Sequence, residues 1–255
     1  MYHSISDPLS REDKRYACRA ETFARHMKFI SSGRYNVVSL DHILDSIQER
    51  RSLPDNALAV TLDDGFSDNY YNALPILERY SVPATIFLTA GLLGSTNVWM
   101  TSKGFPTRNM LSWDHVKEMQ ARRVSFGSHT MTHPPLTEIE SEKARWEIME
   151  SKKIIEDRIG ISIKYFAYPF GLFSDSVVDH VRQAGFSLAC STCSGFNQQG
   201  CDPLLLRRTE VYGTDTVWKL KQKIVFGTNE DNYFLPIKYY FRRLKARMTK
   251  SAFQP

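Results

Sequence analysis

The sequence predicts an α/β protein built on a mostly parallel sheet, and three observations support this. Segments with strand character alternate with segments of helical periodicity along the chain. The chain has 255 residues, which is enough for one large α/β domain. Polar clusters directly follow three of the predicted strands, at the edge where parallel α/β folds build their sites. The sheet could close into a barrel or stay open and doubly wound.

The expected elements follow one another in a regular order. Apolar residues at helical spacing predict helices at 21–30, 41–50, 68–80, 112–121, 138–160, 174–185 and 214–224. Short apolar and β-branched runs predict strands at 35–40, 57–62, 84–89, 124–129, 164–169, 186–190 and 204–211. Asp41 and Ser112 are expected to cap two of the helices, because their side chains can accept hydrogen bonds from free amides of the first turn.

Composition and charge restrict the classes of function. Hydrophobic residues make up 42% and charged residues 24%, as in ordinary soluble proteins. No apolar run approaches the ~20 residues that cross a bilayer. The opening MYHSISDPLS lacks the basic and apolar regions of a signal peptide, so a cytoplasmic location is expected. The chain up to Asp231 is nearly neutral, which argues against a nucleic-acid-binding protein.

The excess positive charge lies in a C-terminal tail, residues 232–255, which follows a single domain at residues 1–231. Apolar and aromatic residues alternate with Lys and Arg in the run FLPIKYYFRRLKARMTK. A basic amphipathic segment of this kind can lie on an anionic membrane surface, which would make the protein peripheral to the membrane. The alternative is a last helix packed on the domain with a solvated basic face.

His129 and His133 stand four residues apart in SHTMTHP, directly after a predicted strand. Two imidazoles at this spacing can meet one metal ion if the chain turns there. A carboxylate from another strand would complete three protein ligands and leave positions open for water. The metalloprotease motif His-Glu-x-x-His is excluded, because Thr130 follows the first histidine. Surface or capping histidines are the alternative.

Two adjacent carboxylates, Asp63 and Asp64, end the strand predicted at 57–62. Each raises the cost of ionising the other, and a cation bound to one of them removes that cost. The second carboxylate can then accept a proton from water, because a metal ion lowers the pKa of bound water from ~16 toward ~7. The alternative is a simple turn at Asp64-Gly65 with Asp63 as a helix cap.

Taken together, these residues resemble the NodB-type polysaccharide deacetylases, carbohydrate esterase family 4. TLDDGFSDNY resembles the family's Thr-Phe-Asp-Asp-Gly motif, GSHTMTHP its His-Ser/Thr-x-x-His motif and FAYPFG its Arg-x-Pro-Tyr motif. The resemblance extends from about residue 2 to about residue 216 and implies a distorted (β/α)-barrel of about seven strands. It implies a metal-dependent hydrolase that removes acetyl groups from amino sugars of a polysaccharide, an oligosaccharide or a lipid- or nucleotide-linked glycan.

The resemblance also implies roles for individual residues. The metal would be held by Asp64, His129 and His133. Zinc is the expected ion, although one carboxylate and two imidazoles also suit cobalt, nickel and manganese. Asp63 would be the base that activates water. The metal and a backbone amide in the stretch Tyr168, Pro169 and Phe170 would stabilise the oxyanion.

The sequence departs from the family pattern in two places. The third motif's arginine, which braces the base, is Ala167 here, and Arg208 is expected to replace it, although a surface arginine is the alternative. The late Leu-x-His motif that supplies the general acid is missing. A branch of the family carries Tyr-His on its first strand, so His3 is expected to protonate the leaving amine. Trp113 resembles an aromatic on which a sugar ring could stack, or it is a core residue.

A catalytically inactive glycan-binding barrel of the same fold is the alternative function. The two departures from the family pattern favour it. The intact set of two aspartates and two histidines argues against it, because a protein that only binds has little need for a base beside a metal.

Overall fold

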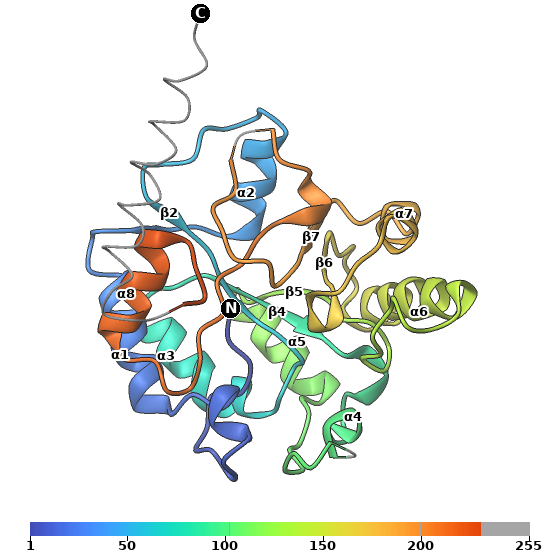
Figure 1. Ribbon diagram of the computed structural model, residues 1–255, viewed down its shortest axis with the longest axis horizontal. Helices are drawn as coiled ribbons and strands as arrows, with labels where there is room; N and C mark the ends of the chain where they lie inside the picture. The colour runs from blue at the N-terminus through green and yellow to red at the C-terminus, as the bar shows by residue number, and fades with distance from the viewer. Residues whose placement is uncertain (102, 199, 231–255) are drawn as a thin grey trace, which may run out of the picture.

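A five-stranded parallel sheet forms the centre of the molecule in the computed structural model (Figure 1). Its strands, in spatial order, are β3 (Val60–Leu62), β4 (Ala84–Leu88), β5 (Ser125–Ser128), β6 (Tyr165–Ala167) and β7 (Leu188–Cys190). A separate parallel pair is formed by β1 (Asn36–Val37) and β2 (Ala57–Leu58). The structure describes residues 1–230 except 102 and 199, so the expected tail lies outside the described residues.

The sheet curls, so that it resembles an incomplete barrel. Single bridges continue it at both edges, with Tyr2 beside Leu62 and Leu206 beside Cys190. Every residue of β3, β4, β6 and β7 is buried, as expected when both faces of a parallel sheet are covered. The expected α/β class with a distorted barrel is therefore confirmed.

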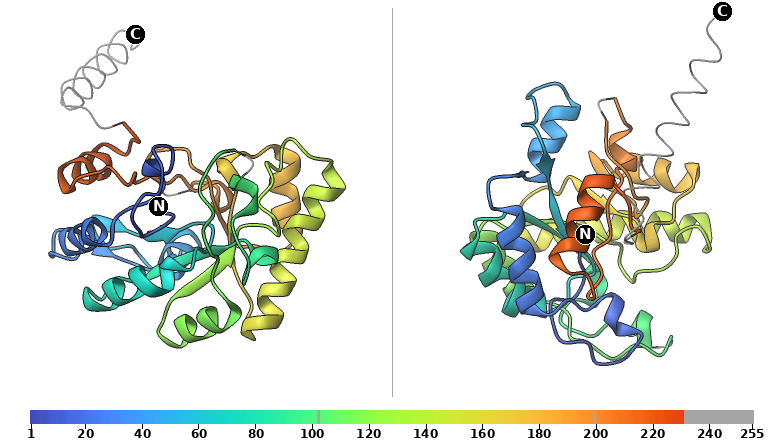
Figure 2. Two further views of the ribbon diagram at one scale, coloured as in Figure 1. Left: turned by 90° about the horizontal axis from the view of Figure 1, so that it is seen from below. Right: turned by 60° about the vertical axis from the view of Figure 1, so that its left-hand side comes forward.

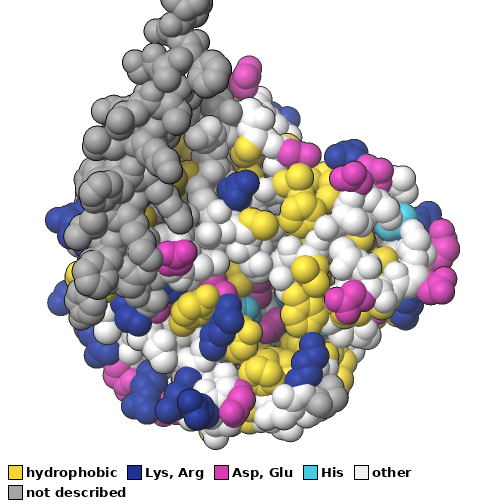
Figure 3. All heavy atoms as spheres, in the orientation of Figure 1, with side chains coloured by type: hydrophobic (Ala, Val, Ile, Leu, Met, Phe, Trp, Pro, Cys, Tyr) yellow, Lys and Arg dark blue, Asp and Glu magenta, His cyan; other side chains and the backbone are white. Residues whose placement is uncertain are grey.

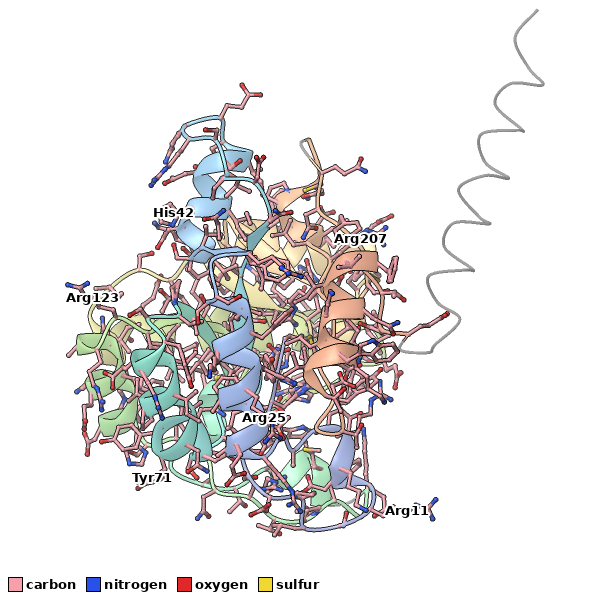
Figure 4. All side chains as sticks on the ribbon, turned by 90° about the vertical axis from the view of Figure 1, so that its left-hand side faces the viewer. Arg11, Arg25, His42, Tyr71, Arg123 and Arg207 are labelled. Atoms are coloured by element: carbon pink, nitrogen blue, oxygen red, sulfur yellow. The ribbon has the colours of Figure 1, made fainter. Side chains whose placement is uncertain are left out.

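The helices surround the sheet on its outer side (Figures 1 and 2). They are α1 (Ala20–Ile30), α2 (Leu40–Ile47), α3 (Leu74–Arg79), α4 (Val98–Thr101), α5 (Trp113–Ala121), α6 (Ser141–Ile159), α7 (Asp175–Gln183) and α8 (Val217–Phe226). α1 packs between α3 and α8 (Figure 4). Among the described residues, no helix is both long and apolar enough to cross a membrane.

Several predicted elements differ from the observed ones. The segment 204–211 is not a strand: after a 3-10 turn at Pro203–Leu205, only Leu206 bridges to the sheet. The amide of Arg208 then bonds to the Cys193 carbonyl, which belongs to a loop and not to a strand. The segment 57–62 divides at Ala59 into β2 and β3, which join different sheets.

The helix caps also correct one expectation. Ser39, and not Asp41, caps α2, because its hydroxyl accepts from the His42 amide. The Asp41 carboxylate instead accepts from the Tyr165 hydroxyl and the Lys164 ammonium group. Ser112 caps α5 as expected.

Candidate active site and metal centre

The carboxyl ends of three strands meet at a cavity of about 350 Å³. Asp63 and Asp64 directly follow β3, His129 follows β5 and Tyr168 follows β6, and all four line this cavity. Figure 3 shows the corresponding hollow, with histidine and acidic side chains in it and hydrophobic and basic side chains around it. The strand-end clusters noted in the sequence are thus brought together because the strands are parallel.

Asp64, His129 and His133 form a compact set of three buried donors. The Oδ1 atom of Asp64 lies 3.5 Å from Nε2 of His129 and 3.4 Å from Nε2 of His133. The two Nε2 atoms are 3.1 Å apart. Ligand atoms placed tetrahedrally about 2.1 Å from a zinc ion would lie about 3.4 Å from one another. The three donors therefore fit a divalent metal ion in type and in spacing.

Backbone and side-chain contacts aim these donors at one another. Nδ1 of His129 lies 2.7 Å from the Ala167 carbonyl, so this nitrogen carries the proton and donates it. The Nε2 lone pair is then free to face a cation, as is the case in metal-binding histidines. Asp64 and His133 adopt left-handed backbone conformations with φ of 75° and 62°, which turn their side chains toward the cavity.

The pKa shifts of these three donors favour a cation bound between them. Burial, followed by the charge of Asp63, raises the pKa of Asp64 well above its usual value. Burial lowers the pKa of His129 to about 4 and also lowers that of His133. Both imidazoles are therefore neutral at pH 7, which is the state that binds metals.

Asp63 stands in a different environment, because Arg208 holds it. Both carboxylate oxygens accept hydrogen bonds of 2.7 Å from the guanidinium group. Burial raises the pKa of Asp63, but the charge and hydrogen bonds of Arg208 lower it by more. The net pKa therefore lies below its usual range. The guanidinium also donates to the Thr61 hydroxyl and the Ser191 carbonyl. The neighbouring Arg207 lies exposed at the surface (Figure 4).

The turn after β6 lines the cavity and leaves one backbone amide without an acceptor among the described residues. The amide of Tyr168 donates to the Cys190 carbonyl, and that of Gly171 donates to the Tyr168 carbonyl. Pro169 has no amide hydrogen. The amide of Phe170 has no hydrogen-bond acceptor within the described part of the chain. Phe170, with φ of 58°, is thus the one position of this turn that can donate to a bound oxyanion.

His3 lines the same cavity, and Trp113 does not belong to its lining. The His3 ring contacts the edge of Tyr16, and its Nδ1 atom is buried without a partner among the described residues. Burial lowers the pKa of His3 below its usual value. Trp113 packs against the hydrophobic core beneath the Arg158 guanidinium, so its position does not support a contact with substrate.

Sequence reasoning missed Trp99 and Lys103, which also line the cavity. Trp99 stacks on the His133 ring, with centroids 4.8 Å apart and planes at 28°. The Phe170 ring meets His133 edge-on at 4.7 Å, and the Lys103 ammonium lies 4.5 Å from the centre of the Phe170 ring. Trp99 and Lys103 belong to the long connection between β4 and α5, which carries no motif. Trp99, in the short helix α4 and half-buried, was the one sequence signal that could have identified this segment.

Comparison with known proteins agrees with this geometry. The family model for polysaccharide deacetylases matches residues 50–189. YxkH of Bacillus subtilis (strain 168), which is provisionally named a polysaccharide deacetylase, is 25% identical over 211 residues, or 83% of this chain and 70% of that protein. The poly-beta-1,6-N-acetyl-D-glucosamine N-deacetylase of Staphylococcus aureus (strain MRSA252) is 26% identical over 191 residues, or 71% of this chain; the chain spans 63% of that enzyme's length.

A solved structure supports the same fold. The structure of IcaB from Ammonifex degensii superposes with a TM-score of 0.71 at 25% sequence identity. The match covers 82% of this chain and 89% of that chain. The similarity therefore extends over most of this chain and supports its fold.

Proposed function

The chain belongs to the polysaccharide deacetylase family, and on this premise we propose that it is a metal-dependent N-deacetylase of glycans that contain N-acetylated amino sugars. The family is one of hydrolases that act on amide bonds. The observation that carries the proposal is the pairing of two sites in one cavity: a three-donor cluster at Asp64, His129 and His133, and an adjacent ionised Asp63. A catalytically inactive glycan-binding barrel would need only cavity walls that contact the glycan, and neither a metal-binding cluster nor an ionised base.

The donor cluster is proposed to hold the metal. Its neutral imidazoles and single carboxylate suit zinc, and they suit other borderline divalent ions as well. A divalent ion bound there supplies a Lewis acid that acidifies water and polarises the acetyl carbonyl.

Asp63 is proposed as the general base. It lies next to the metal ligand Asp64 in the chain and is buried, with both oxygens bonded to Arg208. Arg208 keeps Asp63 ionised and fixes the direction of its carboxylate, so that the base is ready to accept a proton from water. Arg208 acts through Asp63 and is therefore a positioning residue in this scheme.

The remaining steps involve the Phe170 amide and His3. The amide of Phe170 is proposed to donate to the oxyanion that forms when water adds to the acetyl carbon. His3, which lines the same cavity, is proposed to protonate the leaving amine. A lowered pKa makes protonated His3 a stronger acid, while fewer molecules carry the proton at neutral pH.

The proposed substrate is a glycan with β-linked N-acetylglucosamine units. The support is the relationship to the Staphylococcus aureus enzyme, which is a poly-beta-1,6-N-acetyl-D-glucosamine N-deacetylase by name. The half-buried Trp99 and the partly exposed Phe170 offer aromatic faces and edges on which a pyranose ring can pack.

The test is acetate release from short β-1,6-linked and β-1,4-linked N-acetylglucosamine oligomers, with and without chelator and added zinc. Asp63→Asn is the control variant, because it keeps the proposed metal ligands and removes the base. Metal-dependent release that the variant loses is the expected result. Glycan binding without acetate release, at full metal occupancy and with every oligomer, would instead support the binding barrel.

A further inference from the structure

A buried carboxylate outside the reaction holds the loop between the two histidines. Glu147 of α6 is fully buried. Its Oε2 atom accepts from the backbone amides of Met131 and Thr132, both at 2.9 Å. Its Oε1 atom accepts from the Thr132 hydroxyl at 2.6 Å. All three donors lie between His129 and His133, so one side chain binds the whole turn that carries both imidazoles.

Glu147 completes the hydrogen bonding of this loop. Each backbone amide from residue 129 to residue 133 has an acceptor, and the Oε2 atom of Glu147 is the acceptor for two of these amides. For residues 129, 130 and 133, the acceptors are the Leu88 carbonyl at 2.8 Å, the Ser128 hydroxyl at 3.2 Å and the Thr130 hydroxyl at 3.0 Å. Without Glu147, the amide of the buried Met131 would lose its partner.

The opposite side of the loop is held as well. The amides of Ala90 and Gly91 donate to the carbonyls of Thr130 and Met131, both at 2.9 Å. A Cβ atom on Gly91 would lie only 2.8 Å from the Met131 carbonyl oxygen, so the two segments are in close contact. The loop is therefore clamped between the 3-10 turn Ala90–Leu92 and α6.

The clamp is needed because the loop adopts an unfavourable backbone conformation. Thr130 and His133 have φ of 68° and 62°, in the left-handed region. This conformation is rare for a β-branched residue such as threonine, and it persists only where the surroundings enforce it. The same conformation points His133 at Asp64 and His129.

We propose that Glu147 is a positioning residue that sets the metal affinity of the centre, by holding the turn of residues 130–133 in its ligating conformation. The inference rests on the proposed function only in taking Asp64, His129 and His133 as the metal ligands. Groups that orient metal ligands typically change metal affinity by about 10- to 100-fold when they are removed. Glu147 acts through the loop backbone and not through an imidazole nitrogen.

The experiment is a zinc titration of the metal-free full chain against a competing chromophoric chelator. Glu147→Ala is expected to weaken zinc binding by about 10- to 100-fold. Glu147→Gln is expected to bind zinc nearly as the wild type does, because its amide oxygen can accept from both backbone amides and its amide nitrogen can donate to the Thr132 hydroxyl. The visible spectrum of bound cobalt, which reports ligand geometry, should change in the alanine variant and not in the glutamine variant.

The matched control is Ile155→Ala, on the same helix and equally buried. It should lower the melting temperature and leave zinc affinity unchanged. Unchanged zinc affinity in Glu147→Ala, or an equal loss in Ile155→Ala, would overturn the inference. If Glu147→Ala does not fold, Glu147→Asp replaces it, since its carboxylate is one methylene too short to reach the loop; normal affinity there would also overturn it. A wild type that binds zinc but releases no acetate contradicts the proposed function alone, whereas one that binds no divalent metal contradicts both.

Discussion

The guanidinium of Arg208 and the carboxylate of Asp63 form a buried, two-pronged ion pair, with both hydrogen bonds at 2.7 Å. The two residues are 145 positions apart in the sequence. The pair joins the end of β3 to the segment that follows the last bridge of the sheet. Because Thr61 and Ser191 hold the guanidinium in turn, the direction of the Asp63 carboxylate is fixed before any substrate binds.

This pair leads to a prediction about stability. Arg208→Met should lower the free energy of unfolding by about 3–5 kcal/mol, because it leaves Asp63 charged, buried and unpaired. Adding Asp63→Leu should restore most of that loss, since two apolar groups then fill the space. Urea denaturation of the single and double variants checks this. A double variant as unstable as Arg208→Met would show that packing, and not the unpaired charge, causes the loss.

A second prediction concerns His3 as the proton donor. His3→Gln should lower the turnover of N-acetylglucosamine oligomers by about 100- to 10,000-fold while the protein keeps its metal. Turnover of 4-nitrophenyl acetate should fall far less, because its leaving group departs without a proton. Steady-state rates on both substrates, with metal content measured in parallel, provide the test. Equal losses on the amide and the ester would exclude the role of His3 as acid.

Much of the fold could be predicted from the sequence, because local signals and tertiary packing agree there. The helix at 20–30 appears where Phe23, Met27 and Ile30 share one face, and Gly160 ends α6 in the left-handed conformation. The prediction of a strand at 204–211 was wrong for a physical reason. Its apolar residues pack on the core as a strand would, but the chain bonds to a loop and finds no strand partner beyond Leu206.

The site was predictable where its residues follow strand ends directly. The proximity of Asp64 to the two histidines follows from parallel strands. The choice of Arg208 as the brace did not follow from a strand, because the segment that carries it forms none. Glu147 was not identified, although a signal existed: it occupies a core position of α6, in line with Ala144, Ile148 and Ser151. An acidic residue among core positions requires a buried partner, but the sequence does not show which loop supplies it.

A third prediction is a loss of stability at low pH that depends on His26. The ring is buried between the Tyr2 hydroxyl and the Asp215 carbonyl, both at 3.1 Å, and burial lowers its pKa to about 4. The unfolded chain, with a histidine pKa of about 6.5, binds more protons between these values. Stability should therefore be complete above about pH 6.5 and fall toward pH 4, with a contribution of about 1.4 kcal/mol per pH unit from this group.

The control for this pH dependence is His26→Gln, which cannot titrate. His3, His129 and His133 also have lowered pKa values and contribute in the same direction. The difference in slope between wild type and variant, measured by denaturation at several pH values, isolates His26. Parallel slopes would mean that His26 is not neutral in the folded protein.

The last prediction separates the roles of Trp99 and Trp113. Trp99 stacks on the His133 ring beside the cavity, whereas Trp113 packs on the core. Trp99→Ala should raise KM for the oligomers by about 2- to 10-fold, because an aromatic wall of the cavity is lost. Trp113→Ala should lower the melting temperature and leave kcat/KM unchanged. Kinetics of both variants at a temperature where both are folded make the comparison, and a raised KM in Trp113→Ala with normal kinetics in Trp99→Ala would reinstate Trp113 as the substrate contact.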